Sequence, residues 1–132
     1  MRLELIRHGE TALQKEHRYQ GITDAPLSPE GRKTLHPAGN LPEHVIVTPL
    51  QRTRETADIL FPGVPQLVIS DLQEMNFGSF EGKNYLEMEH DPDYLAWVAA
   101  NCESPCPDGE TKASFSERIC RAFSALVDKA LA

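Results

Sequence analysis

The alternation of apolar and polar residues predicts short strands separated by helices. Leu3 and Leu5 alternate with charged residues and Ile6 closes the run, which is the period of a strand. Residues 45–47 and 67–69 are uninterrupted runs of Val, Leu and Ile, a pattern typical of buried strands. Strands that alternate with helices predict an α/β fold with a mostly parallel sheet flanked by helices, in a single domain over residues 1–132.

Helix signals occupy the intervals between these strands. Ser28 before Pro29 is a typical helix start, and Pro37 limits that helix to a few residues. Helical spacing predicts a longer helix at residues 50–60. Residues 12–23 are mixed and polar, so we expect a loop there.

Further helices are expected in the second half of the chain. Residues 85–89 are predicted to be helical, and Asp91 before Pro92 repeats the start signal. Residues 114–117 have the pattern of a capping box, and an amphipathic stripe behind them extends to Ala130.

The end of the sequence lacks the residues that normally stop a helix. The last helix is expected to reach Ala132, and three strands are few for a buried parallel sheet. We therefore expect that one or more strands of the domain follow residue 132.

Polar side chains follow each of the three expected strands. Arg7 and His8 follow the first, Arg52 follows the second within the first turn of a helix, and Glu74 follows the third. The carboxyl ends of parallel strands share one edge of a sheet, where ligands bind. A helix N-terminus at Arg52 also favours an anion. The pattern therefore predicts a phosphate site around an imidazole.

Composition and charge narrow the class of partner. The formal net charge of −7 argues against nucleic acid, and the apolar runs are too short to cross a membrane. Three cysteines without a secretory signal indicate reduced thiols and a cytoplasmic protein. Cys102 and Cys106 have no second Cys or His pair at zinc spacing, so we expect no metal and no cofactor. The oligomeric state stays open, a homodimer included.

Four stretches in this order resemble the signatures of the histidine phosphatase superfamily, which contains cofactor-dependent phosphoglycerate mutases and many phosphomonoesterases. They are Arg7-His8-Gly9-Glu10-Thr11 with residues 18–31, then residues 48–57, residues 72–82, and residues 107–111 followed by Arg118. The resemblance covers nearly the whole chain and implies a phosphoglycerate mutase-like fold.

The resemblance also implies roles for individual residues. His8 would be the nucleophile that becomes a phosphohistidine, Arg7 and Arg52 would hold the phosphoryl oxygens, and Glu74 would be the general acid and base. Glu81 is the alternative acid. The residues expected to bind substrate are Thr11, Gln14, Arg18, Gln20 and Gly21. Gln14 stands where the family usually has Asn, and an exposed surface charge is an equally good interpretation of Arg18.

The family has a second catalytic His after a late strand, typically followed by Gly, and no such second pattern occurs in this sequence. We expect that His beyond Ala132. The alternative is a protein that lacks it and binds phosphate without catalysis.

The loop after Glu74 and the stretch 107–111 are similar to those of the phosphatase branch, and in particular to the bacterial α-ribazole phosphatases of cobalamin biosynthesis. The resemblance thus implies an enzyme that hydrolyses a small phosphorylated metabolite. A phosphoglycerate mutase is the alternative enzyme.

Overall fold

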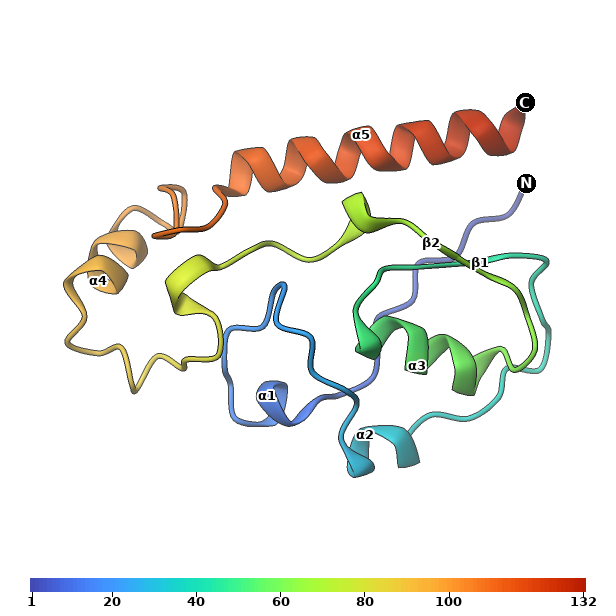
Figure 1. Cartoon of the computed structure of the whole chain (residues 1–132), viewed down its shortest axis with the longest axis horizontal. Helices are drawn as coiled ribbons and strands as arrows, with labels where there is room; N and C mark the ends of the chain where they lie inside the picture. Colours follow the sequence, from blue (N-terminus) through green and yellow to red (C-terminus); the bar gives the residue numbers. More distant parts are fainter.

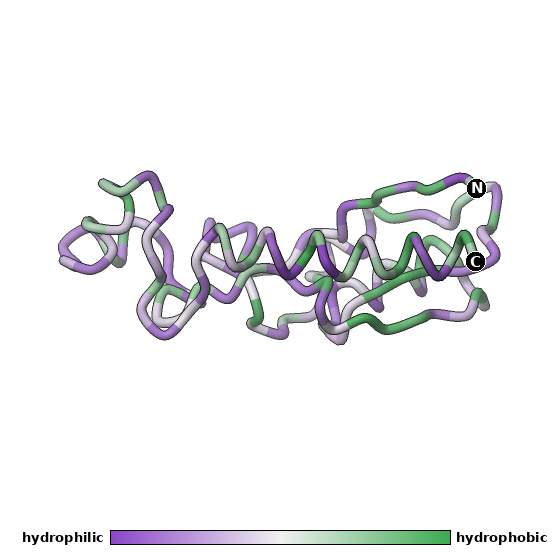
Figure 2. Tube along the Cα trace, turned by 90° about the horizontal axis from the view of Figure 1, so that it is seen from above, coloured by the Kyte–Doolittle hydropathy of each residue, from purple (hydrophilic) through white to green (hydrophobic).

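The computed structural model describes all residues 1–132. The molecule is elongated, with the strands β1 (Val45–Val47) and β2 (Gln66–Val68) at one end and the helix α4 (Pro92–Ala99) at the other (Figure 1). The long helix α5 (Lys112–Leu131) runs along the molecule between these ends, and both chain termini lie at the end that holds the strands (Figures 1 and 2).

The sheet is a parallel pair joined by a helix. Val45, Ile46 and Val47 of β1 pair in register with Gln66, Leu67 and Val68 of β2. The helix α3 (Gln51–Leu60) connects the two strands and packs against β1. The predicted strands at 45–47 and 67–69 are confirmed within one residue, as is the expected helix at 50–60. The predicted α/β class with a parallel sheet is therefore confirmed.

The first predicted strand is wrong. Residues 3–6 form no strand and make no backbone hydrogen bond to another segment, and the side chain of Leu5 is 86% exposed. Alternation along the chain shows which residues suit a pleated surface, but a strand also needs the edge of a neighbouring strand to pair with.

One helical turn lies inside the stretch that we expected to be a loop. The helix α1 (Ala12–Lys15) is capped by Thr11, whose hydroxyl accepts from the Gln14 amide nitrogen at 3.3 Å. The Gln14 side-chain oxygen accepts from the Thr11 nitrogen at 3.0 Å, which completes a capping box. Thr and Gln three residues apart were the overlooked signal.

The other helix starts agree in part with the sequence. Ser28 caps α2 (Pro29–Lys33) and Asp91 caps α4, as expected. The cap of α5 is Thr111 rather than Ser114, because Ser114 occupies the third helical position and bonds back to Thr111. The predicted helix at residues 85–89 is wrong: these residues form turns, with one backbone bond between residues four apart and the next between residues three apart.

An aromatic cluster forms the core at the α4 end. Its buried members are Met75, Phe80, Met88, Tyr94, Trp97 and Cys106, with Tyr19 and Phe77 packed against them. Several of the ring pairs meet edge to face, at centroid distances near those preferred by aromatic rings. Of the two 3-10 turns, η1 (Ser70–Leu72) lies just before the cluster residue Met75, and η2 (Gly78–Phe80) contributes Phe80 to the cluster.

The long helix α5 covers the molecule without burying any side chain completely. Apolar and polar residues alternate along it (Figure 2), and it packs against η1 (Figure 1). None of the helices has the length and apolar character that a membrane span requires.

Candidate active site

His8 is held in place by its neighbours although it follows no strand. The Gly9 nitrogen donates to the Thr56 hydroxyl of α3 at 2.9 Å. The Glu10 carbonyl accepts from the Ser28 nitrogen at 3.0 Å, and a Cβ on Gly31 would come within 2.1 Å of that carbonyl oxygen. The His8 segment is thereby fixed between α2 and α3.

One ring nitrogen of His8 is free to act as a nucleophile. His8 Nδ1 lies 2.7 Å from the Gly9 carbonyl oxygen. A carbonyl oxygen only accepts, so Nδ1 carries the proton and donates it. In the neutral ring the lone pair is then on Nε2.

The surroundings of His8 favour its neutral form. Burial is the largest effect and lowers the pKa of His8 below its usual value of 6.5. The positive charges of Arg52 and Arg7 lower this pKa further, while the Gly9 hydrogen bond and the Glu74 carboxylate raise it. The imidazole is therefore mostly unprotonated at neutral pH.

His8 and Glu74 line the same pocket, which has a volume of about 430 Å³. The other lining residues are Arg7, Gln14, Arg18, Tyr19, Gln20 and Phe77. The pocket thus joins the first signature, the stretch 18–20 and the loop after β2. It brings together an imidazole, a carboxylate and several side chains with N–H groups that can donate hydrogen bonds.

The guanidinium of Arg52 is largely occupied by the protein itself. Arg52 is 1% exposed; its Nη1 donates to the Thr23 carbonyl at 2.9 Å, and its Nη2 donates to the Gly21 carbonyl at 2.6 Å. With the Gln20 amide nitrogen facing Thr11, the Gln20 oxygen accepts from Arg52 Nε at 3.1 Å and from Nη1 at 3.0 Å. A guanidinium has five N–H groups, so one on Nη2 is left without a protein partner. Arg52 itself does not line the His8 pocket, and its charge acts on His8 from behind the pocket wall.

Unlike Arg52, Arg7 has a guanidinium that the protein itself leaves unoccupied. It is exposed, lines the pocket and makes no hydrogen bond or ion pair with the rest of the chain. All its N–H groups are therefore available for a bidentate contact with a phosphoryl group.

The Glu74 carboxylate has one anchored oxygen. Its Oε1 accepts from the Met75 nitrogen at 2.8 Å, and Met75 itself is buried in the aromatic cluster. The Glu74 residue is exposed, so the second carboxylate oxygen is open to the pocket and to water.

Of the expected substrate-binding residues, Gln14, Arg18 and Gln20 line the pocket and the other two do not. Arg18 is paired with Glu16 and Glu87 and donates to the Gly82 carbonyl at 2.8 Å. Its charge is therefore already balanced by two carboxylates.

Thr11 and Gly21 lie outside the pocket lining and contact residues near it. Thr11 is completely buried, with its hydroxyl bonded to Gln20. The Gly21 carbonyl accepts from Arg52, and a Cβ at Gly21 would lie 1.6 Å from the Met75 carbonyl oxygen. Only glycine fits that approach.

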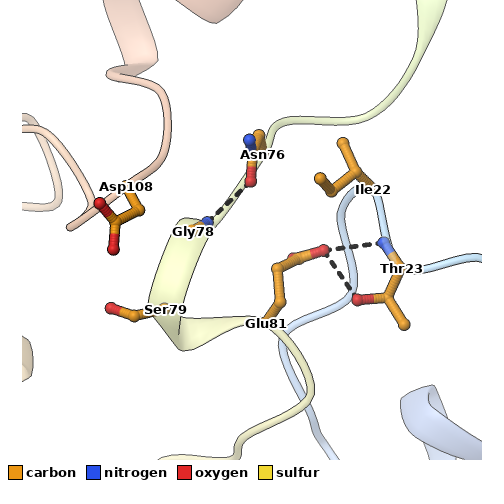
Figure 3. A pocket seen from close by; sticks show the side chains of 7 residues that line it. All are labelled: Ile22, Thr23, Asn76, Gly78, Ser79, Glu81 and Asp108. Atoms are coloured by element: carbon orange, nitrogen blue, oxygen red, sulfur yellow. Dashed lines mark hydrogen bonds between the residues drawn. The ribbon is translucent and has the colours of Figure 1, made fainter.

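Glu81, the alternative acid, lies away from the His8 pocket. It belongs to a second, polar pocket that also contains Ile22, Thr23, Asn76, Gly78, Ser79 and Asp108 (Figure 3). Its carboxylate accepts from the Gly21 nitrogen at 2.9 Å, and from the nitrogen and hydroxyl of Thr23 at 2.9 and 3.0 Å. Glu81 thus fixes the loop whose carbonyls hold Arg52.

Tyr19 and Phe77 were not assigned to the site from the sequence. Their ring centroids are 5.2 Å apart, and both rings line the His8 pocket. Each lies inside a stretch that carries the family resemblance, beside Arg18 and Gly78, which was the available signal. No group of three or more His, Cys, Asp or Glu side chains is arranged to hold a metal ion.

Known proteins are similar to this chain in sequence and in fold. The sequence model of the histidine phosphatase superfamily (branch 1) matches residues 3–131. The chain is 34% identical over 135 residues to an adenosylcobalamin/alpha-ribazole phosphatase of Salmonella typhimurium, covering 96% of this chain and 67% of the relative. It is 31% identical over 137 residues to a probable phosphoglycerate mutase of Escherichia coli, covering 97% of this chain and 64% of the relative.

Among solved structures, the fold is similar to that of a putative alpha-ribazole-5'-P phosphatase from Escherichia coli K-12. The TM-score is 0.81 at 26% identity, and the match covers 93% of this chain and 65% of that one. The chain therefore spans about two thirds of the length of the relatives it matches.

Proposed function

The chain belongs to branch 1 of the histidine phosphatase superfamily, and from that premise we propose that it hydrolyses phosphate monoesters through a phosphohistidine on His8. The observation that carries the proposal is the shared pocket of His8 and Glu74, together with the hydrogen bond that leaves the His8 lone pair on Nε2.

In the first step, His8 Nε2 attacks the phosphorus atom. The N–P bond forms and the P–O bond to the alcohol breaks, while Glu74 donates a proton to the leaving oxygen. In the second step, Glu74 takes a proton from water, the water oxygen bonds to phosphorus and the N–P bond breaks. Inorganic phosphate leaves and His8 is neutral again.

The charges around the pocket support such a transfer. The transferring phosphoryl group gains stability from fixed positive charges and hydrogen-bond donors. Arg7 offers a free guanidinium fork in the pocket, and the buried Arg52, outside the pocket lining, adds a positive charge that is already fixed in place near His8. A group fixed before the reaction costs little reorganisation during it.

The walls of the pocket favour an ester with an aromatic or apolar alcohol. Tyr19 and Phe77 give the pocket an aromatic side next to the charged one. Because two of the similar proteins are named as alpha-ribazole or alpha-ribazole-5'-P phosphatases, α-ribazole 5'-phosphate is the first substrate to test. We also propose that the enzyme acts in the cytoplasm, since its three cysteines are free thiols.

The test is hydrolysis of p-nitrophenyl phosphate and of α-ribazole 5'-phosphate by this chain, with EDTA present, beside His8→Ala and Glu74→Gln. We expect turnover by the parent chain, none by His8→Ala, and a loss of about 10²-fold or more for Glu74→Gln on the ribazole ester. Binding of phosphate without turnover by the parent chain would contradict the proposal and favour a non-catalytic module.

The same assay separates a phosphatase from a mutase. A mutase would return the phosphoryl group to an organic acceptor, as the name of one relative implies for that relative. Release of inorganic phosphate in a 1:1 ratio to alcohol is the expected result, and interconversion of phosphoglycerates without phosphate release would favour the mutase.

A further inference from the structure

The guanidinium of Arg118, on α5, donates hydrogen bonds to the loop that carries Glu74 and to one carboxylate. Its Nη1 donates to the carbonyls of Asp71 at 2.7 Å and Gln73 at 2.9 Å, and its Nη2 donates to the Glu74 carbonyl at 3.2 Å. Its Nε and Nη2 donate to the two carboxylate oxygens of Glu110, at 3.0 and 2.9 Å. All five N–H groups are thus engaged.

Glu110 holds the other side of the same loop. Its Oε1 also accepts from the Asn76 nitrogen at 2.8 Å, and its own nitrogen donates to the Asn76 carbonyl at 2.8 Å. The side chains of Glu110 and Arg118 are 23% and 22% exposed, so the pair is partly shielded from water. The loop is therefore hydrogen-bonded to Arg118 and Glu110 at residues before, at and after Glu74.

The Glu110–Arg118 pair stays charged over a wide range of pH. The Arg118 hydrogen bonds hold the pKa of Glu110 below its usual value, and the Glu110 hydrogen bonds raise the pKa of Arg118. Arg118 also lies over the Phe115 ring, with its guanidinium carbon 5.3 Å from the ring centroid, which restrains the side chain further.

The loop around Glu74 has little regular structure of its own. Glu74 follows the single turn η1 and belongs to neither a helix nor a strand, and its side chain bonds only to the next backbone nitrogen. The direction of its carboxylate is therefore set by the backbone of residues 71–76. That backbone rests on α5 through Arg118, and η1 lies against α5 (Figure 1).

We propose that Arg118, held by Glu110, is a positioning residue that aims the Glu74 carboxyl at the leaving oxygen of the substrate. This inference rests on the proposed function. Arg118 and Glu110 do not line the His8 pocket, so neither touches substrate. A small rotation of the loop would leave His8 and the phosphate-binding groups in place and misplace only the proton donor.

A leaving-group comparison tests this role. Arg118→Lys keeps the charge but cannot reproduce the planar fork with five donors. An alkyl phosphate needs a proton on its leaving oxygen, whereas p-nitrophenolate leaves with little assistance. We expect kcat of Arg118→Lys to fall about tenfold or more on glycerol 3-phosphate and by less than about threefold on p-nitrophenyl phosphate. KM for both esters should change little.

Arg121→Lys is the matched control, because Arg121 lies on the same helix in an exposed ion pair with Glu117. Arg121→Lys should leave kcat on both esters unchanged. Should Arg118→Lys fail to fold, Glu110→Gln tests the same selective loss. Equal losses on both esters, or none on the alkyl ester, would overturn the proposal and leave Arg118 a purely structural residue.

A second measurement separates this inference from the proposed function. Wild-type protein that hydrolyses neither ester would refute the function, but hydrogen exchange of the Met75 amide would still decide whether Arg118 fixes Glu74. That amide is bonded to the Glu74 carboxylate, so we expect its exchange to be at least about tenfold faster in Arg118→Lys and unchanged in Arg121→Lys. Unchanged exchange in Arg118→Lys would overturn the positioning role.

Discussion

At the residue scale, the two arginines beside His8 differ in what they can still bind. Arg52 donates four of its N–H groups to Gly21, Thr23 and Gln20, whereas Arg7 donates none within the protein. Arg52 therefore combines a charge near His8 with a structural role, and Arg7 is the arginine available for a bidentate contact.

Substitution should separate these two arginines. Arg52→Met leaves the Gly21 carbonyl without a donor and removes one of the two donors to the Thr23 carbonyl, so we expect the free energy of unfolding to fall by roughly 2–4 kcal/mol. Arg7→Gln should change the free energy of unfolding by less than about 0.5 kcal/mol and weaken phosphate binding. Urea unfolding and phosphate titration measure the two effects, and similar unfolding curves for both variants would contradict the assignment.

The charge state of His8 gives a second prediction at this scale. Burial lowers the pKa of His8 below 6.5, and Arg7 adds to that effect. The NMR titration of the His8 ring should have its midpoint below pH 6.5, and Arg7→Gln should move that midpoint to higher pH. Because the folded state resists protonation, this residue's contribution to stability is lost as the pH falls from 6.5 through the lowered value.

Arg54→Gln is the control for that titration, since Arg54 is an exposed residue of α3 that does not contribute to the His8 shift. A midpoint at or above 6.5 in the wild-type protein would show that His8 is not in the buried, positively charged surroundings described here.

At the element scale, the position of the His8 segment depends on its close contact with α2. Gly31 lies in that helix with space for no side chain, because the Glu10 carbonyl oxygen occupies the place of a Cβ. Alanine normally favours a helix over glycine, so helix propensity and close packing predict opposite effects at this position.

We expect packing to prevail at Gly31. Gly31→Ala should lower the free energy of unfolding by about 1–3 kcal/mol and reduce turnover, because the Glu10 carbonyl and with it His8 must move. Gly39→Ala is the control, since a Cβ there meets nothing within 4 Å. It should change stability by less than about 1 kcal/mol in either direction. Chemical denaturation of both variants checks this, and a more stable Gly31→Ala would contradict the close approach.

Capping signals and short apolar runs predicted part of the architecture from the sequence alone. The strands, α2, α3 and α4 follow from residues close together in the chain, such as Ser28 with Pro29. The segment 3–6 does not, because pairing depends on a distant edge that no local pattern reveals. Thr111 and Ser114 both suit a cap, and only the geometry of the first turn decides between them.

Contacts between residues far apart in the sequence also limited the prediction of the site. His8 and Glu74 were predicted to meet, and they line one pocket. No local pattern indicates that the carbonyls of residues 21 and 23 accept hydrogen bonds from Arg52, or that Arg118 donates to the Glu74 loop. These bonds join residues about 30 and 45 positions apart. Long-range bonds to backbone carbonyls leave no residue-type signature.

At the scale of the whole molecule, the site lies where two parts of the fold meet. His8 is fixed by α2 and α3 near the strands, whereas Glu74 leads into the aromatic cluster near α4. The helix α5 runs along both parts and contacts η1, so it links the segment that carries Glu74 to the rest of the chain (Figure 1). The proposed nucleophile His8 and the proposed proton donor Glu74 thus come from separately supported segments.

The most direct test of this account is to trap the phosphorylated protein. The chain is mixed with p-nitrophenyl phosphate, quenched in alkali because phosphohistidine is labile in acid, digested and examined by mass spectrometry. The account predicts one phosphoryl group on the peptide that contains His8, with its amount increased in Glu74→Gln and absent in His8→Ala. A phosphoryl group on another residue, or hydrolysis that continues undiminished in His8→Ala, would contradict it.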